Sequence, residues 1–158
     1  MIEIALFQPD IAANAATIMR MAACLGLKVR IIEPAGFTWS DSSLKRAGMD
    51  YLAKTDLIRD RSWLEFRAAT PGRRLVLLTT RATLPYTAVS FAAGDILLMG
   101  RESAGVPEAV HASASFSATI PMLPGLRSLN VALACAMVTG EALRQLGAFP
   151  PISPGEVG

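Results

Sequence analysis

Five short, largely apolar runs constrain the fold of this chain more than any other feature of its sequence. They lie at residues 2–7, 28–32, 74–79, 95–99 and 116–120. A strand with one face in water alternates apolar and polar residues, whereas a strand buried on both faces is apolar nearly throughout. Helical patterns separate these runs along the chain. The sequence therefore predicts an α/β fold in which a parallel sheet is covered by helices on both faces.

The helical patterns are short except for the first and the last. The predicted helices before the last one cover residues 14–25, 42–47, 62–69 and 107–112, and Leu57 and Ile58 predict a further brief strand. Gly26 ends the first of these helices, because glycine adopts the left-handed conformation that closes a helix. No repeat and no internal linker interrupts the series.

The longest predicted helix follows the last apolar run. A loop with Pro121 and Gly125 leads to Ser128, whose hydroxyl is a good N-cap for a helix that begins there and ends at Gly147. Asn130 would then lie inside the first turn without a capping role, which makes it a candidate for ligand binding. Helical spacing predicts one buried face, composed of Leu129, Leu133, Ala136, Met137, Leu143 and Leu146. A strand, a loop and a helix N-terminus in this order are typical of a ligand site in an α/β protein.

The length of 158 residues fits one domain, which we place at residues 1–150, followed by a flexible tail rich in Pro and Gly at residues 151–158. No apolar run approaches the roughly 18 residues of a membrane span, and the N-terminus lacks the basic start of a signal peptide. We therefore expect a cytoplasmic protein with no membrane partner. Hydrophobic residues make up 52% of the chain, which for a small soluble chain also suggests a buried subunit interface.

The formal net charge of +2 does not by itself indicate a nucleic-acid partner, but the cations are unevenly distributed. Eight of them lie between residues 45 and 74, namely Lys45, Arg46, Lys54, Arg59, Arg61, Arg67, Arg73 and Arg74. From charge alone, a solvated face is the better interpretation and an RNA-binding face is the second.

Several classes of site are excluded by what the sequence lacks. The single histidine, His111, rules out a multi-histidine metal site, and Cys24 and Cys135 are isolated in helical patterns, where we expect both to be reduced and buried. We therefore expect no metal. Neither GxGxxG nor GxSxG occurs. Residues 100–105, GRESAG, have the glycine spacing of a phosphate-binding loop, but Val106 and Pro107 follow where that loop has Lys and Ser or Thr.

Three polar segments remain, at residues 14–20, 100–107 and 127–130, and each follows a predicted strand, where α/β proteins bind ligands. Taken singly, each has an ordinary structural interpretation, with Asn14 and Ser128 as helix caps and Glu102 as a turn carboxylate. Ala16 and Ala23, however, leave room beside Arg20 for its guanidinium to reach a phosphate.

Taken together, these segments resemble the three motifs of the SPOUT superfamily, in its TrmH-type RNA 2′-O-methyltransferase branch. The stretches QPDIAANAATIMRMAACLG, IIEPAGFTWSDSSLKRAGMDY and IPMLPGLRSLNVALA are similar to the small TrmL subfamily, over nearly the full length of the chain. The resemblance implies an α/β fold with a deep C-terminal trefoil knot, an S-adenosylmethionine cofactor and an obligate homodimer. The implied reaction is methylation of a ribose 2′-hydroxyl at the wobble position of the tRNA anticodon, on cytidine or on a modified uridine.

The resemblance also implies roles for individual residues. The cofactor pocket would be formed by Leu78, Thr79, Gly100, Ile120, Met122 and Ser128. The catalytic residues, on the side where RNA arrives, would be Asn14, Arg20, Glu102, Ser128 and Asn130. A guanidinium is a poor base, so we expect Arg20 to bind the adjacent phosphate and polarise the hydroxyl while a neighbouring group accepts the proton. Two protomers would pool their basic residues against the anticodon stem, namely Lys45, Arg46, Arg59, Arg61, Arg73 and Arg74.

Two positions depart from the family pattern, since Ala16 stands where glycine is usual and Arg101 where the subfamily often has proline. Two other interpretations stay open. One is methylation of another RNA such as ribosomal RNA, although such enzymes commonly carry an additional RNA-binding domain. The other is a catalytically silent homologue that binds cofactor or RNA, which the presence of all the polar motif residues disfavours. A scaffold protein without a ligand would require the three motifs to be coincidence.

Overall fold

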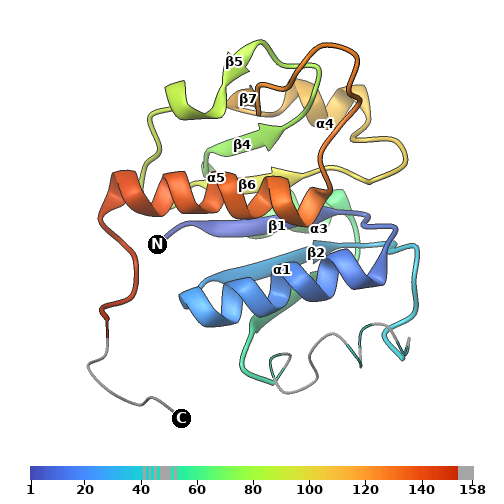
Figure 1. Cartoon of the computed structure of the whole chain (residues 1–158). Helices are drawn as coiled ribbons and strands as arrows, with labels where there is room; N and C mark the ends of the chain where they lie inside the picture. Colours follow the sequence, from blue (N-terminus) through green and yellow to red (C-terminus); the bar gives the residue numbers. More distant parts are fainter. Residues whose placement is uncertain (41, 43, 45, 47–50, 52, 153–158) are drawn as a thin grey trace.

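A parallel β-sheet forms the centre of the molecule, as the apolar runs predict (Figure 1). The computed structural model describes residues 1–40, 42, 44, 46, 51 and 53–152. In this part of the chain, seven strands pair in the order β3-β2-β1-β6-β4-β7-β5, and each pair is parallel. The strands are β1 (Glu3–Phe7), β2 (Lys28–Ile32), β3 (Asp56–Asp60), β4 (Leu75–Leu78), β5 (Leu84–Pro85), β6 (Ile96–Met99) and β7 (Phe116–Thr119).

Helices cover both faces of this sheet, which confirms the predicted layers. The helices are α1 (Ala12–Leu25), α3 (Trp63–Ala69), α4 (Glu108–Ala112) and α5 (Val131–Leu146), and a 3-10 turn, η1, spans Tyr86–Ala88. Ile4 and Leu6 of β1 belong to the core that α1 and α5 cover. The intervening Ala5 belongs to the core beneath α3 and α4. In Figure 1, α1 and α5 lie side by side on the near face of the sheet.

The sequence-based boundaries hold for most elements. Gly26 and Gly147 cap α1 and α5 with positive φ values of 66° and 59°. The strand expected at Leu57 and Ile58 is longer, β3, and the two-residue β5 was not predicted. The helix expected over residues 42–47 falls partly on residues outside the described part of the chain, as do Lys45 and most of the predicted tail. The threading that would make a trefoil knot stays a prediction.

The buried face of α5 differs from the predicted one. Leu133 and Met137 are 60% and 42% exposed. Leu143 is buried as predicted, and the other buried residues of the face toward α1 and β6 are Ala132, Cys135, Val138, Thr139 and Ala142. Smaller side chains let a helix approach a sheet closely, and the larger apolar residues are left on the outer surface. The helical period identifies two apolar stripes here, and it does not tell which of them faces the core.

Cys24 is a second correction. It lies near the end of α1 and is exposed, whereas Cys135 on α5 is buried as expected. The desolvation of Cys135 raises the pKa of its thiol to about 12, so this thiol stays protonated at neutral pH. Among the described residues, no helix is long and apolar enough to span a membrane.

An ion pair between neighbouring strands is buried inside the molecule, and its loss should measurably lower the free energy of unfolding. Arg30 on β2 donates to both carboxylate oxygens of Asp60 on β3, at 2.7 and 2.9 Å. Their side chains are only 7% and 3% exposed. Replacing Asp60 by alanine would leave a buried guanidinium unpaired, so we expect Asp60→Ala to lower the free energy of unfolding by about 3 to 5 kcal/mol in urea denaturation.

The matched control is Asp56→Ala, at the other end of the same strand. Asp56 is 65% exposed and lies 3.6 Å from the Lys28 ammonium. This exposed pair should contribute less than about 1 kcal/mol. Equal losses for the two variants would show that burial does not set the cost.

Candidate functional site

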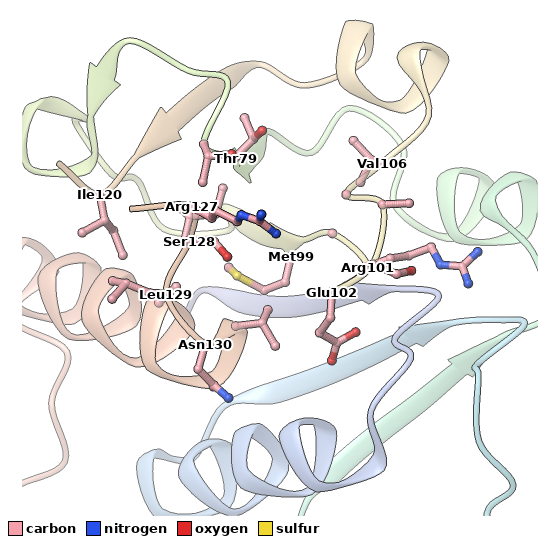
Figure 2. A pocket seen from close by; sticks show the side chains of 18 of the residues that line it. Thr79, Met99, Arg101, Glu102, Val106, Ile120, Arg127, Ser128, Leu129 and Asn130 are labelled. Atoms are coloured by element: carbon pink, nitrogen blue, oxygen red, sulfur yellow. The ribbon is translucent and has the colours of Figure 1, made fainter. Parts of the chain in front are cut away.

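A cavity of about 490 Å³ opens at the edge of the sheet where the parallel strands end (Figure 2). Residues at the ends of β4, β6 and β7 and before α5 line it. All six residues expected to hold a cofactor are among the lining residues, namely Leu78, Thr79, Gly100, Ile120, Met122 and Ser128. Asn14, Glu102 and Asn130 line it as well. Its size is in the range of cavities that hold small organic ligands.

One wall of the cavity is a tight hairpin after β6. Arg101 and Gly105 exchange backbone hydrogen bonds of 2.8 and 2.9 Å, which closes the loop around Glu102. A Cβ on Gly100 would lie 2.8 Å from the carbonyl carbon of Gly105, closer than real side chains approach backbone. Gly105 has a φ of +64°, which favours glycine for a conformational reason. The two glycines of the GRESAG stretch thus have different roles.

The start of α5 corrects the predicted capping. Asn130, not Ser128, is the N-cap, and its Oδ1 accepts from the N–H groups of Ala132 at 2.8 Å and Leu133 at 3.3 Å. The helix begins at Val131, so Ser128 lies before it and lines the cavity. Serine and asparagine are both good caps, and the sequence alone did not distinguish a start at 128 from one at 131.

Side chains from the three motif segments are joined by hydrogen bonds. Asn130 Nδ2 donates to Asn14 Oδ1 at 2.9 Å, and Asn14 Nδ2 donates to Glu102 Oε1 at 3.3 Å. The capping bonds fix the oxygen of Asn130, so its nitrogen faces Asn14, and the amide of Asn14 must then present its nitrogen to Glu102. Asn14 is therefore a linking residue inside α1 and not the helix cap that was one alternative.

Asp10, between β1 and α1, is the residue that sequence reasoning missed. Its Oδ1 accepts from Arg101 Nη2 at 2.7 Å, and its Oδ2 accepts from Ser103 N at 3.0 Å and Ser103 Oγ at 2.5 Å. The bonds from Ser103 and Arg101 lower the pKa of Asp10 to about 2. The only sequence signal was an acidic residue in the short segment between a predicted strand and a predicted helix. Arg101 points toward this carboxylate and away from the cavity (Figure 2).

Arg20 lies outside the cavity formed by its own chain. Its side chain is exposed on α1, and its guanidinium carbon is 4.8 Å from the centroid of the Tyr51 ring. Ala16 is buried in the core, 4% exposed, so it faces the interior while Arg20 faces outward. The structure thus brings together Asn14, Glu102, Ser128 and Asn130, and it leaves Arg20 apart.

Among the residues that the structure describes, the basic side chains expected to bind RNA are not gathered on one surface. Arg73 and Arg74 precede β4, at the edge of the sheet opposite the cavity, and they bind Glu3, Gly94 and Asp95. Two others lie at the opposite end of the sheet, where Arg59 is the last but one residue of β3 and Arg61 follows that strand. Arg59 and Arg61 line a second cavity of about 360 Å³ together with Glu33, Pro34, Ala35, Phe37 and Trp39.

Arg46 is the last of the described residues expected to bind RNA, and the described part of the chain holds no candidate metal site. Arg46 is exposed and donates to the hydroxyl of Ser42 at 3.2 Å, so it faces solvent. Within the residues that the structure describes, no group of three or more His, Cys, Asp or Glu side chains could hold a metal ion.

Comparison with known proteins identifies the family. Residues 1–140 match the model of the SpoU rRNA Methylase family. The chain belongs to this family. Among SpoU relatives, the tRNA (cytidine(34)-2′-O)-methyltransferase of Beijerinckia indica is 59% identical over 151 residues, which cover 94% of each chain. The predicted resemblance to TrmH-type SPOUT methyltransferases is thereby confirmed.

Solved structures of SpoU methylases share the fold. One described as giving insights into the 2-OH methylation of C/U34 on tRNA has a TM-score of 0.89 and 40% identity, and the match covers 93% of this chain and 97% of that one. An AdoMet-bound rRNA methyltransferase of Sinorhizobium meliloti has a TM-score of 0.79 and 27% identity, over 92% of this chain and 56% of the other. The rRNA methyltransferase is therefore longer and contains sequence that this chain does not match.

The hairpin geometry predicts that substitution of Gly100 lowers the free energy of unfolding more than substitution of Gly105. Gly100→Ala places a Cβ against the Gly105 backbone, and we expect the free energy of unfolding to fall by about 1 to 3 kcal/mol, as for other overpacked sites. Gly105→Asn is the control, because nothing lies within 4 Å of its Cβ position and asparagine tolerates a positive φ. Calorimetry of both variants measures the difference. A Gly105→Asn loss as large as that of Gly100→Ala would contradict the steric explanation.

Proposed function

We propose that this SpoU methylase is an S-adenosylmethionine-dependent tRNA 2′-O-methyltransferase that modifies the ribose of the wobble nucleotide, cytidine or a modified uridine. The observation that carries the proposal is the convergence of the three motif segments on one cavity, where Asn130, Asn14 and Glu102 are hydrogen bonded in series. The identity of 59% to a protein named as a tRNA (cytidine(34)-2′-O)-methyltransferase supports the substrate. A tRNA substrate also fits a cytoplasmic enzyme.

The residues of the cavity fit S-adenosylmethionine. Leu78, Ile120 and Met122 offer apolar walls for an adenine ring, and Thr79 and Ser128 offer hydroxyls for a ribose. Gly100 allows the two arms of the hairpin wall to pack backbone to backbone, since a Cβ there would lie 2.8 Å from the Gly105 carbonyl carbon. When bound, the cofactor supplies a methyl group on a positively charged sulfur. The AdoMet-bound relative supports this assignment.

Methylation of a hydroxyl requires that the hydroxyl lose its proton. Glu102 is the one carboxylate among the described residues that line the cavity, so we assign it as the proton acceptor. Its two oxygens accept from Asp10 N and Asn14 Nδ2 at 2.8 and 3.3 Å, which orients the carboxylate and leaves lone pairs free. Arg20 binds the phosphate next to the reacting ribose and polarises the hydroxyl, because a guanidinium stays charged at neutral pH.

Arg59 and Arg61 are the basic residues whose positions best support an RNA contact. Arg59 lies at the end of β3 and Arg61 follows it, at the same edge of the sheet as the main cavity. Their side chains are 48% and 85% exposed. The guanidinium of Arg59 lies 4.4 Å from the centroid of the Trp39 ring and is held there by Glu33. A planar guanidinium fixed in this way can stack on an unpaired base. Arg73 and Arg74, on the opposite edge, would lie outside this surface.

The direct test is methyl transfer from labelled S-adenosylmethionine to total tRNA from a strain that lacks this gene. We expect a single 2′-O-methyl group at the wobble nucleotide, mapped by nuclease digestion and mass spectrometry. Arg20→Ala should abolish transfer and leave cofactor affinity nearly unchanged, because Arg20 does not line the cavity. Parallel loss of both would count against this division of roles. Transfer to ribosomal RNA alone would support the second candidate substrate, and cofactor binding without transfer would indicate a silent homologue.

A homodimer is part of the proposal, because the outer surface of α5 and the loop before it are unusually apolar. Exposed residues there are Leu123 (76%), Leu126 (65%), Leu129 (39%), Leu133 (60%) and Met137 (42%). They occupy one continuous stretch of the chain, from the cavity to the middle of α5. Contiguous exposed apolar residues mark protein interfaces, and an obligate dimer interface resembles a protein core.

The dimer predicts a distinct effect of charge on α5. We expect Leu133→Glu to convert the dimer to a monomer in analytical ultracentrifugation, because a carboxylate would be desolvated in an apolar interface. Leu64→Glu is the matched control, since Leu64 is 79% exposed on α3, on the other face of the sheet. An unchanged sedimentation coefficient for Leu133→Glu, or an equal change for Leu64→Glu, would refute this interface.

A further inference from the structure

Asp10 contacts the catalytic hairpin on both sides of Glu102 while it lies outside the cavity. Its carboxylate binds Arg101 and Ser103, the residues immediately before and after Glu102. Its own N–H donates to Glu102 Oε2 at 2.8 Å. One residue thus holds three consecutive residues of the hairpin, and Asp10 itself does not line the cavity.

We propose that Asp10 is a positioning residue, which acts through Arg101 and Ser103 to keep the Glu102 carboxylate directed at Asn14 and the cavity. The inference rests on the proposed methyl-transfer function and names a residue that sequence analysis did not single out. Small displacements of a reacting group cost large factors in rate, so the geometry of the hairpin matters beyond its stability.

Asp10 is itself held by rigid surroundings. Gly36 N donates to Pro9 O at 2.8 Å, and a Cβ on Gly36 would lie 3.0 Å from Asp10 Cα, so the two loops are packed backbone to backbone. Gln8, two residues earlier, has a φ of 44°, and its N–H donates to Ile32 O at 2.8 Å. We call the contacts of Asp10 with Arg101, Glu102 and Ser103 the clamp. Its support comes from the segments that follow β1 and β2, which are buried strands of the central sheet.

The ion pair also determines where the Arg101 cation lies. Arg101 is adjacent to Glu102 in sequence, so without Asp10 its guanidinium would be an unpaired cation next to the proposed proton acceptor along the chain. Asp10 Oδ1 accepts hydrogen bonds from Arg101 Nη2 at 2.7 Å and Nε at 3.3 Å, and Gln8 Oε1 accepts from Arg101 Nη1 at 3.4 Å. Glu102 is then free to be held by two neutral donors. Its pairing with Arg101 would make the carboxylate a weaker base.

The Asp10 carboxylate remains ionised under all conditions in which the enzyme would work. The pKa of Asp10 is lowered to about 2 by the bonds from Ser103 and Arg101. A depressed folded-state pKa stabilises the fold above the usual value of 3.8, and this contribution is lost as the pH falls toward 2. The clamp is thus a permanent part of the site and not a switch near neutral pH.

A double-mutant cycle tests whether Asp10 acts through Glu102. Four proteins are compared in the methyl-transfer assay: the wild type, Asp10→Asn, Glu102→Gln and the double variant. We expect Asp10→Asn to lower kcat by about 10- to 100-fold, as expected for a misplaced catalytic group. In the Glu102→Gln background the same substitution should change kcat less than about twofold, because the group that it positions is already disabled. A fifth protein, Asp10→Asn/Arg101→Gln, should recover part of the rate lost in Asp10→Asn, because Arg101→Gln removes the guanidinium that the loss of Asp10 leaves unpaired.

The controls separate positioning from loss of fold. Asp56→Asn, an exposed partner of Lys28 remote from the hairpin, should leave kcat unchanged. Amide hydrogen exchange supplies a readout that does not depend on activity, and Asp10→Asn should speed exchange in residues 101–105 while α3 keeps its protection. Equal reductions of kcat in both backgrounds, or unchanged exchange in the hairpin, would overturn the inference. A wild-type protein without transfer to any RNA, whose hairpin still loosens in Asp10→Asn, would refute the proposed function while leaving the clamp itself standing.

Discussion

A short series of hydrogen bonds at the ends of the parallel strands joins the three motif segments that line the cavity. It runs from the N-cap of α5 through Asn130 and Asn14 to Glu102, and from there to Asp10. Asn130 and Asn14 are 116 residues apart in sequence, and Glu102 and Asp10 are 92 apart. Such contacts form only because the order of strands places the ends of β1 and β6 next to each other. A parallel sheet collects the loops that follow its strands at one edge, and here those loops carry the polar residues.

The direction of these bonds is determined at one end by a helix. The first turn of α5 leaves N–H groups that need an acceptor, and the side-chain oxygen of Asn130 satisfies two of them. This leaves a donor for Asn14, which in turn donates to the carboxylate of Glu102. A feature that stabilises a helix thus also orients a carboxylate toward the cavity. The same helix presents small residues to the core and large apolar residues to its outer surface, so α5 contributes to the core, the cavity and the proposed dimer interface.

The sequence predicted the layers of the fold well, because continuous apolar runs report burial on both faces of a strand. It predicted the capping and the facing of α5 less well. Ser128 and Asn130 are equally suitable caps by residue type, and the choice depends on where the preceding loop ends in space. The exposed positions of Leu133 and Met137 follow from close packing of α5 against α1 and β6, which periodicity does not encode. Asp10 was missed because its partners, Arg101 and Ser103, are more than 90 residues away.

For the site, the position of polar segments after strands indicated where to look, and the family resemblance indicated which residues would line a cofactor pocket. All six of those residues line the cavity, whereas Arg20, Arg59, Arg61, Arg73 and Arg74 do not. The cavity forms where the loops that carry the motifs meet at the ends of the strands, and the position of each motif after a strand indicates that meeting point. The surface that meets RNA depends on how side chains such as Arg73 and Arg59 pair with acidic neighbours, and a charge pattern does not contain that information.

We propose that the cavity at the carboxyl edge of the sheet binds the cofactor while Glu102 stays hydrogen bonded to Asn14 and Asp10. A crystal structure of the protein with S-adenosylhomocysteine tests it most directly. We expect the nucleoside to bind between Leu78, Ile120 and Ser128, with the Asn130–Asn14–Glu102 hydrogen bonds retained. A nucleoside bound elsewhere, or a Glu102 carboxylate turned to Arg101, would contradict it.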